Sequence, residues 1–332
     1  MAGAAEMEEP GGVGVAPSTI PVSVVIPVYN ALDRLPAAVA SAQGQSLPPR
    51  QIVVVDDGST EGNAQAVLAA AGPAVSGRAR LCVERQPNGG PSRARNRGIE
   101  LADQDWIAFL DADDTWEPDK LEHQWRALAS HPQAVLVSTG WRRPAVPRPA
   151  RPVPPPRLEP DAAARVAWLN RFQTSTVLAR REILLDAGLF APEMDGLEDW
   201  DMWLRVVARG PWVHIPFPFV RYADTPGGVS KDTERAYRVG LERLQAYRSG
   251  RADSRAARSI TERVLLWHHV RYAFAFHRLG QAGRRDRCLR AAWRRGQRLR
   301  CAEVAVRGLT PFLAGRVLAR LRGAPSGQAR QG

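Results

Sequence analysis

The sequence predicts an α/β protein whose central sheet is mostly parallel and flanked by helices, with a helical appendage at the C-terminus. Two observations lead to this prediction. Between residues 22 and 110, short apolar runs rich in Val and Ile alternate with helical segments, and such runs are typical of strands buried on both faces of a parallel sheet. Strand and helix at this spacing indicate βαβ units with right-handed crossovers. Beyond residue 230 only helical patterns remain.

The predicted elements follow one another closely along the chain. Strands are expected at 22–29, 51–55, 79–84, 106–110 and 174–178, and helices at 32–43, 62–71, 92–101, 161–170, 180–187 and 198–208. Residues 142–160 are rich in proline and arginine, so we expect a loop or extended segment there, because proline removes a backbone donor and breaks helices. Near the C-terminus an apolar stripe is interrupted by Gly280 and Gly283, which predicts a helical hairpin.

Composition divides the 332 residues into three parts. We expect a flexible leader over 1–20, a domain over 21–230 and a basic helical region over 231–332. The net charge of +12 belongs to the last part, which holds 24 Lys and Arg against 7 Asp and Glu. Two interpretations of this region stay open. It is either a solvated appendage or dimer surface, or it contributes an interfacial helix near residues 312–322 that meets an anionic membrane.

Several classes of protein are disfavoured by what the sequence lacks. No apolar run reaches the roughly 20 residues that a membrane-spanning helix needs, and the N-terminus has neither the basic nor the apolar region of a signal peptide. The three cysteines, Cys82, Cys288 and Cys301, have no paired spacing, which argues against a disulfide framework or a zinc site. We therefore expect a cytoplasmic protein, free or peripheral at the inner face of the plasma membrane.

The strongest candidate site is the segment Phe109-Leu110-Asp111-Ala112-Asp113-Asp114. Two aspartates separated by one residue follow a predicted strand, at the sheet edge where open α/β proteins bind ligands. Hard carboxylate oxygens of this kind suit Mg²⁺ or Mn²⁺, which bridge to substrate phosphates. Taken alone, the same pattern fits a solvated acidic turn or a helix cap.

Three further segments place polar groups at the ends of predicted elements. Asp57, in Val55-Asp56-Asp57-Gly58-Ser59, can accept hydrogen bonds from a nucleotide, although Asp-Gly also signals a plain turn. Two glycines precede the helix that carries Arg95, and backbone N–H groups at such a start can bind an anion. The run Glu198-Asp199-Trp200-Asp201-Met202-Trp203 combines a candidate general base with aromatic faces for a sugar, or else with tryptophans of the core.

Together these segments resemble the family-2 glycosyltransferases, which have the GT-A fold, a Rossmann-like architecture. The resemblance covers roughly residues 22–230 and rests on five segments in the family's order and spacing: 23–30, 54–59, 88–99, 109–114 and 198–201. It implies an inverting, metal-dependent hexosyltransferase that moves a sugar from a nucleoside-diphosphate sugar, a UDP-sugar first of all, to a hydroxyl of a glycan, lipid-linked or other acceptor. The implied setting is synthesis of a cell-surface polysaccharide or glycan.

The resemblance also implies which residues bind the donor: Pro27, Tyr29, Asp57, Arg95 and Asp111. Pro27 and Tyr29 would line the base pocket, and Asp57 would bind the base. Arg95 would contact the donor, and Asp111 would approach the ribose as well as the metal.

For the chemistry, the resemblance implies that Asp113 with Asp111 holds Mg²⁺ or Mn²⁺, and that Asp199 is the general base for the acceptor hydroxyl. One segment departs from the family pattern. Many members carry Arg-x-His before a serine near the donor phosphates, and here Arg221-Tyr222-Ala223 has alanine in place of the histidine. Contact with the diphosphate from this loop would then fall to Arg221 or Lys231.

Two other functions stay open on the residues alone. A nucleotidyltransferase of similar fold would join a nucleoside triphosphate to a sugar phosphate, but such enzymes carry a glycine-rich basic loop after the first strand, where this chain has Pro27-Val28-Tyr29-Asn30. A non-catalytic membrane- or nucleic-acid-binding protein would use the basic C-terminal region. Nucleic acid is not the expected partner, because the arginines are scattered along helices without groove-reading elements between them.

Overall fold

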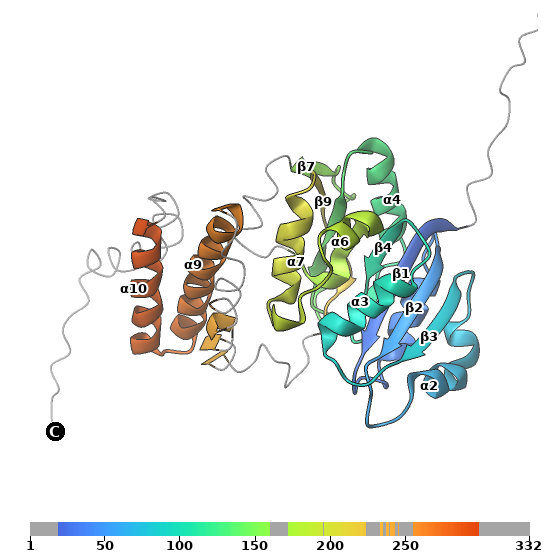
Figure 1. Ribbon diagram of the computed structural model, residues 1–332. Coiled ribbons are helices and arrows are strands. Elements are labelled where there is room, and N and C mark those ends of the chain that lie inside the picture. Colours follow the sequence, from blue (N-terminus) through green and yellow to red (C-terminus); the bar gives the residue numbers. More distant parts are fainter. Residues whose placement is uncertain are drawn as a thin grey trace, which may run out of the picture.

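A nine-stranded sheet forms the middle layer of the protein, and helices cover both of its faces (Figure 1). The computed structural model describes residues 19–159, 172–194, 196–223 and 255–298, with several more between 233 and 245. The strands are β1 (Ile20–Val28), β2 (Pro49–Asp56), β3 (Arg80–Arg85), β4 (Trp106–Phe109), β5 (Thr115–Trp116), β6 (Leu136–Arg142), β7 (Arg157–Glu159), β8 (Val177–Arg180) and β9 (Trp212–Arg221). Their order is β3-β2-β1-β4-β8-β6-β9-β5, and β7 also pairs with β9.

The first half of the sheet is parallel, as the sequence predicts. Strand β1 pairs with β2 and β4, and β2 pairs with β3, all in parallel. Burial on both faces explains the apolar runs: Val24 and Ile26 of β1 face one hydrophobic layer, while Val25 faces the other. Side chains that alternate across a strand must all be apolar when both faces are covered.

The second half of the sheet is mixed, so the expected parallel pairing is interrupted after β4. Strand β8 runs antiparallel to both β4 and β6, and β6 pairs with β9 in parallel. The short strands β5 and β7 are antiparallel to β9. Because β8 reverses the direction twice, β6 and β9 point the same way as β1–β4. The carboxyl ends of all six strands therefore lie along one edge of the sheet.

Three helices cover each face. On one side lie α1 (Leu35–Gln43), α2 (Ala64–Ala71) and α4 (Lys120–Ser130), and on the other lie α3 (Pro91–Leu101), α6 (Arg181–Asp186) and α7 (Glu198–Val207). Helix α3 approaches β1 so closely that a Cβ atom at Gly98 would collide with the side chain of Val25. Apolar contact across both faces is the main stabilising contribution to such a layered domain.

The predicted helical hairpin is formed by α9 (Arg255–Arg278) and α10 (Ala282–Arg298). Gly280 has a φ of 69° in the turn between them, a conformation that glycine adopts without strain. Leu265 of α9 belongs to the same hydrophobic cluster as Trp203 of α7, so the hairpin packs on the side of the sheet that α7 covers (Figure 1). Among the described helices, none combines the length and the apolar character that a bilayer span requires.

Several predicted elements need comment. The strand expected at 174–178 begins only at Val177, because residues 174–176 form a 3₁₀ turn. Within the loop expected at 142–160, residues 143–156 are irregular and lie between the end of β6 and the short strand β7. Helix α4 and strands β6 and β9 were not predicted. The helix expected at 161–170 and the interfacial helix near 312–322 lie outside the described residues.

Replacing Gly98 by alanine is expected to destabilise the domain by about 1–3 kcal/mol, because the added methyl group must displace Val25 in a closely packed core. Urea unfolding followed by circular dichroism measures the change. Gly283→Ala in α10 is the matched control, since its new Cβ would meet no atom within 4 Å. The control should be neutral or stabilising, by at most about 1 kcal/mol. Equal stability of the two variants would contradict this account of α3.

Candidate functional site

The residues proposed to bind a donor gather at the carboxyl edge of the sheet. Tyr29 follows β1 and is 49% exposed, and Pro27 near the end of the same strand is half-buried. Asp57 follows β2, and Asp111 lies just after β4. Since β1, β2 and β4 are adjacent and parallel, these side chains come from neighbouring strand ends. The structure thus places all four at one edge, where ligands of open α/β sheets bind.

Asp57 is buried and holds the loop before α3. Its Oδ1 accepts hydrogen bonds from Gln86 Nε2 at 2.7 Å and from Gly89 N at 2.9 Å, and its Oδ2 accepts one from Gly90 N at 2.8 Å. The two glycine N–H groups that the sequence suggested for an anion are therefore already used. Oδ2 retains a lone pair for a further donor, so base binding by Asp57 stays a prediction.

Arg95 links two of the candidate segments. Its Nη2 donates to Asp111 Oδ1 at 2.9 Å and its Nη1 donates to Glu198 Oε1 at 3.0 Å, although the guanidinium is almost fully buried. Burial lowers the pKa of Arg95, but the charges of Asp111 and Glu198 outweigh that effect and raise the pKa above its ordinary value. The sequence did not predict Glu198 as the partner of Arg95. The only sequence signal for Glu198 was its place beside Asp199 in the Glu-Asp pair.

The acidic turn after β4 is more crowded than the two-aspartate pattern suggested. Asp111 and Asp113 are half-buried, whereas Asp114 is buried. Asp114 Oδ2 accepts a hydrogen bond from Ser175 Oγ at 2.5 Å, and its Oδ1 accepts one from Ala223 N at 2.9 Å. Burial and then the charge of Asp111 raise the pKa of Asp114 to about 8. Asp114 therefore joins the acidic turn to the 3₁₀ turn before β8 and to the chain just after β9.

This turn suits a divalent cation by its donor set. Among the described residues no group of three His, Cys, Asp or Glu side chains forms a ready metal cage. Mg²⁺ and Mn²⁺ do not need one, because they bind through one or two carboxylates and keep waters or substrate phosphates as the other ligands. Asp111 and Asp113 supply two carboxylates on a turn whose negative charge adds to burial in raising the pKa of Asp114. The residues present are therefore compatible with the expected ion.

Asp199 lies in the first turn of α7, where its Oδ1 accepts a hydrogen bond from Trp200 N at 2.6 Å. It is half-buried and directly follows Glu198. The two tryptophans of the same segment are not available to a sugar: Trp200 is 3% exposed and Trp203 is 0% exposed. The suggestion of an aromatic sugar platform at this helix is wrong, because both rings pack into the core with Phe109 and Phe190.

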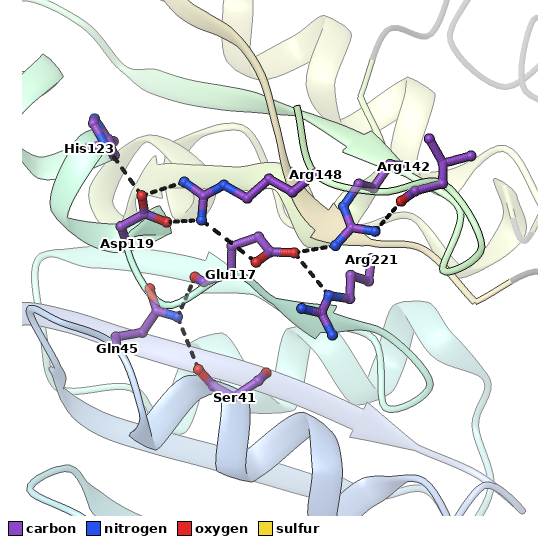
Figure 2. Close-up of polar contacts among 9 residues, drawn as sticks. Ser41, Gln45, Glu117, Asp119, His123, Arg142, Arg148 and Arg221 are labelled. Carbon is purple, nitrogen blue, oxygen red and sulfur yellow. Dashed lines mark hydrogen bonds and ion pairs between the residues drawn. The ribbon is translucent and has the colours of Figure 1, made fainter. Parts of the chain in front are cut away.

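A second charged network lies at the carboxyl ends of β6 and β9, and the sequence did not predict it (Figure 2). Glu117 Oε1 accepts hydrogen bonds from Arg142 Nη2 at 2.6 Å and from Arg221 Nε at 2.9 Å. Arg148 Nη1 lies 3.6 Å from Glu117 Oε2. Both Nη atoms of Arg148 donate to the carboxylate of Asp119, which makes a bidentate pair. Burial opposes ionisation of Glu117, but the hydrogen bonds from Arg221 and Arg142 hold its pKa below the ordinary value.

Arg221, proposed to replace a missing histidine at the donor phosphates, is thus oriented by Glu117. Its guanidinium is half-exposed, and the bond to Glu117 uses only its Nε. Lys231, the other candidate for that contact, lies outside the described residues.

Comparison with known proteins gives the family of the chain. Residues 23–187 match the family model described as glycosyl transferase family 2. The chain belongs to glycosyl transferase family 2. One curated relative is the succinoglycan biosynthesis protein ExoW of Rhizobium meliloti, which is 42% identical over 110 residues. That match covers 32% of this chain, and the chain spans only 34% of the length of ExoW.

Two solved structures share the fold of this family member. The S. aureus TarS fragment 1–349 in complex with UDP-GlcNAc superposes with a TM-score of 0.59 at 18% identity. The match covers 84% of this chain and 83% of that fragment. The mannosyltransferase PcManGT from Pyrobaculum calidifontis, in complex with GDP-Man and Mn²⁺, gives 0.56 at 20% identity and covers 92% of this chain and 83% of its own. The expected GT-A fold with a C-terminal helical region is confirmed.

Arg95→Ala is expected to cost about 3–5 kcal/mol of unfolding free energy, because it leaves the buried Glu198 and the half-buried Asp111 facing each other without a cation. Chemical unfolding of the purified variant measures the loss. Arg97→Ala on the same helix is the control, since the Arg97 side chain is 39% exposed and its ion pairs with Glu84 and Glu100 are open to solvent. A loss no larger for Arg95→Ala than for Arg97→Ala would show that the buried network does not hold these segments.

Proposed function

We propose that this protein is an inverting glycosyltransferase that transfers a sugar from a nucleoside-diphosphate sugar to an acceptor hydroxyl. The observation that carries the proposal is the pair of hydrogen bonds from Arg95 to Asp111 and Glu198. Through them a turn suited to a metal and a helix start with a candidate base belong to one cluster. A nucleotidyltransferase would need no such base, because its acceptor is a sugar phosphate and not a sugar hydroxyl.

Donor binding is proposed at the ends of β1, β2 and β4. Tyr29 and Pro27 would line the base, Asp57 would accept from a base N–H, and Asp111 would lie near the ribose. Uridine is the proposed nucleoside, and the binding of UDP-GlcNAc by TarS supports it at the level of a shared fold. Arg221, held by Glu117, would contact the diphosphate with its exposed Nη atoms.

Asp111 and Asp113 would hold Mg²⁺ or Mn²⁺, and the Mn²⁺ present with GDP-Man in PcManGT supports this choice. An ion bound there would act as a Lewis acid for the diphosphate leaving group. Asp199 would accept the proton of the acceptor hydroxyl while that oxygen forms a bond to the anomeric carbon and the bond from this carbon to the diphosphate oxygen breaks. A single displacement of this kind inverts the anomeric configuration. The contribution of Asp199 would come mainly from its placement on a fixed helix start.

The proposed setting is synthesis of a cell-surface polysaccharide or glycan, with residues 21–230 as the catalytic unit. The name of ExoW, a succinoglycan biosynthesis protein, supports this setting. A saccharide, lipid-linked or free, would then be the acceptor.

Metal-dependent hydrolysis of UDP-sugars, screened one by one, tests the proposal. Asp113→Ala is expected to lower the rate by at least about 100-fold, because it removes a metal ligand, and Asp199→Ala should lower it by a similar factor, because water also needs a base. Asp103→Ala is the control, since Asp103 is paired with Arg80 on the protein surface. Hydrolysis by Asp113→Ala as fast as by the parent protein would contradict the mechanism.

Contact with an anionic membrane is a separate part of the proposal. Helix α10 exposes Arg287, Arg290 and Arg294 at a spacing of three and four, which places them on one face, and Trp293 beside them is half-exposed. None of the ion pairs within the described part of the chain involves these arginines. Such a face fits anionic headgroups with an interfacial tryptophan.

Flotation with vesicles tests that contact. The protein should float with phosphatidylglycerol vesicles at low salt, float less as salt screens the charges, and stay unbound with phosphatidylcholine alone. The triple variant R287Q/R290Q/R294Q should lose most of the binding, and the single variant Arg97→Gln should keep it. Equal flotation of the triple variant and the parent would assign the contact to another surface.

A further inference from the structure

An aromatic pair lies at the same edge of the sheet as the acidic turn, and the proposed mechanism does not use it. Trp141, next to the last residue of β6, is 41% exposed, and Tyr222 directly follows β9. Their ring centroids are 5.3 Å apart and the ring planes are inclined by 59°. The rings are therefore not stacked face to face. Tryptophan is usually mostly buried, so a ring left exposed at the sheet edge where ligands bind is available for contact with one.

The two rings are held by the network around Glu117. Trp141 precedes Arg142, Tyr222 follows Arg221, and both arginines donate to the same oxygen, Glu117 Oε1 (Figure 2). A backbone hydrogen bond from Tyr222 N to Arg142 O, at 2.8 Å, fixes the two strand ends directly. The aromatic pair therefore has a defined geometry although it lies at the end of the sheet.

The same strand end also contacts the acidic turn. Ala223, the residue after Tyr222, donates its N–H to Asp114 Oδ1 at 2.9 Å. Asp114 in turn directly follows Asp113 in the sequence. The hydrogen bond between Ala223 and Asp114 thus connects the aromatic pair with the proposed metal site, because Ala223 follows Tyr222 and Asp114 follows Asp113.

We propose that Trp141 and Tyr222 form the binding platform for the acceptor saccharide, and that Glu117 is a positioning residue that holds this platform through Arg142 and Arg221. The proposal rests on the transferase function proposed above and names its acceptor as a pyranose. Axial C–H groups on one face of a pyranose ring form a weakly positive, apolar surface, which is attracted to the negative face of an indole ring. The ring hydroxyls stay at the rim, where water can bind them.

Stability alone does not explain the network. The side chains of Glu117 and Arg142 are 5% and 8% exposed, and an ion pair at that depth loses much of its hydration without a matching gain in stability. A well-packed apolar pair would serve a purely structural role at least as well. Positioning of two strand ends beside a binding site gives the charges a use that apolar packing would not.

Saturation-transfer NMR with irradiation of aromatic protons tests the platform without knowledge of the natural acceptor. The probes are the methyl pyranosides of glucose, galactose, mannose and N-acetylglucosamine, and the control is glucitol, an acyclic polyol that lacks a ring face. At least one pyranoside should receive transfer well above glucitol. Trp141→Ala should lower that transfer about tenfold, as expected for the loss of one stacking contact, while Trp141→Phe should retain most of it.

Two further variants separate binding from folding. Trp293→Ala removes another exposed tryptophan, on α10, and should leave the transfer unchanged. Glu117→Gln keeps both rings but removes the charge that holds the arginines, so it should lower the transfer in protein that circular dichroism shows to be folded. Transfer equal in Trp141→Ala and the parent, or no pyranoside above glucitol, would overturn the platform. Full transfer in Glu117→Gln would overturn the positioning role.

The measurement is independent of the transferase proposal. It requires neither a donor nor a metal, so loss of the platform and loss of the proposed chemistry give different results. Metal-dependent hydrolysis of a UDP-sugar by the parent protein without pyranoside binding at Trp141 would leave the transferase and remove the platform. Pyranoside binding at Trp141 without any donor hydrolysis would support a saccharide site and remove the transferase.

Discussion

Arg95 lies between two carboxylates, Asp111 at the end of β4 and Glu198 at the start of α7, that are far apart in the sequence. One of them is buried and the other half-buried, and at such a position two carboxylates repel each other unless a cation lies between them. The guanidinium supplies that charge and, because it is planar and rigid, it also fixes the direction from which each carboxylate approaches. Arg95 on α3 therefore holds both the acidic turn and the start of the helix that carries Asp199.

The network around Glu117 inverts this arrangement. There a single buried carboxylate holds two guanidinium groups, from the ends of β6 and β9. Asp114 lies between the two networks and bonds to Ser175 on one side and Ala223 on the other. The carboxyl edge of the sheet is thus divided into a half built on β1–β4, where we propose that the nucleotide binds, and a second half built on β6 and β9. The proposed chemistry lies where the two halves meet, which is also where a donor and an acceptor have to meet.

The fold was predictable where burial was uniform. Strands β1 and β2 are covered on both faces and consist of unbroken apolar runs, so their pattern was unambiguous. Helix α4 was missed because its buried face includes Lys120 and Gln124, which hydrogen-bond to each other and break the apolar period. Strand β9 was missed because Pro216 and Pro218 indicate an interruption. They are tolerated because the pairing with β6 shifts register between Ile215 and Pro218, where a ladder donor is not required.

The site was predictable only as far as chemistry follows from residue type and order. Aspartates after strands fix where charge can gather, because strand direction decides which edge they reach. Exposure of an aromatic ring has no such local signature. Trp203 and Trp141 differ in the molecule because Trp203 lies on the inner face of a helix that packs against the sheet. Trp141 lies on the part of β6 that still pairs with β9 but extends past its pairing with β8. That difference depends on the mixed second half of the sheet, which the sequence did not reveal. The acceptor side of the proposed site could therefore be argued only once the direction of β6 and β9 was known.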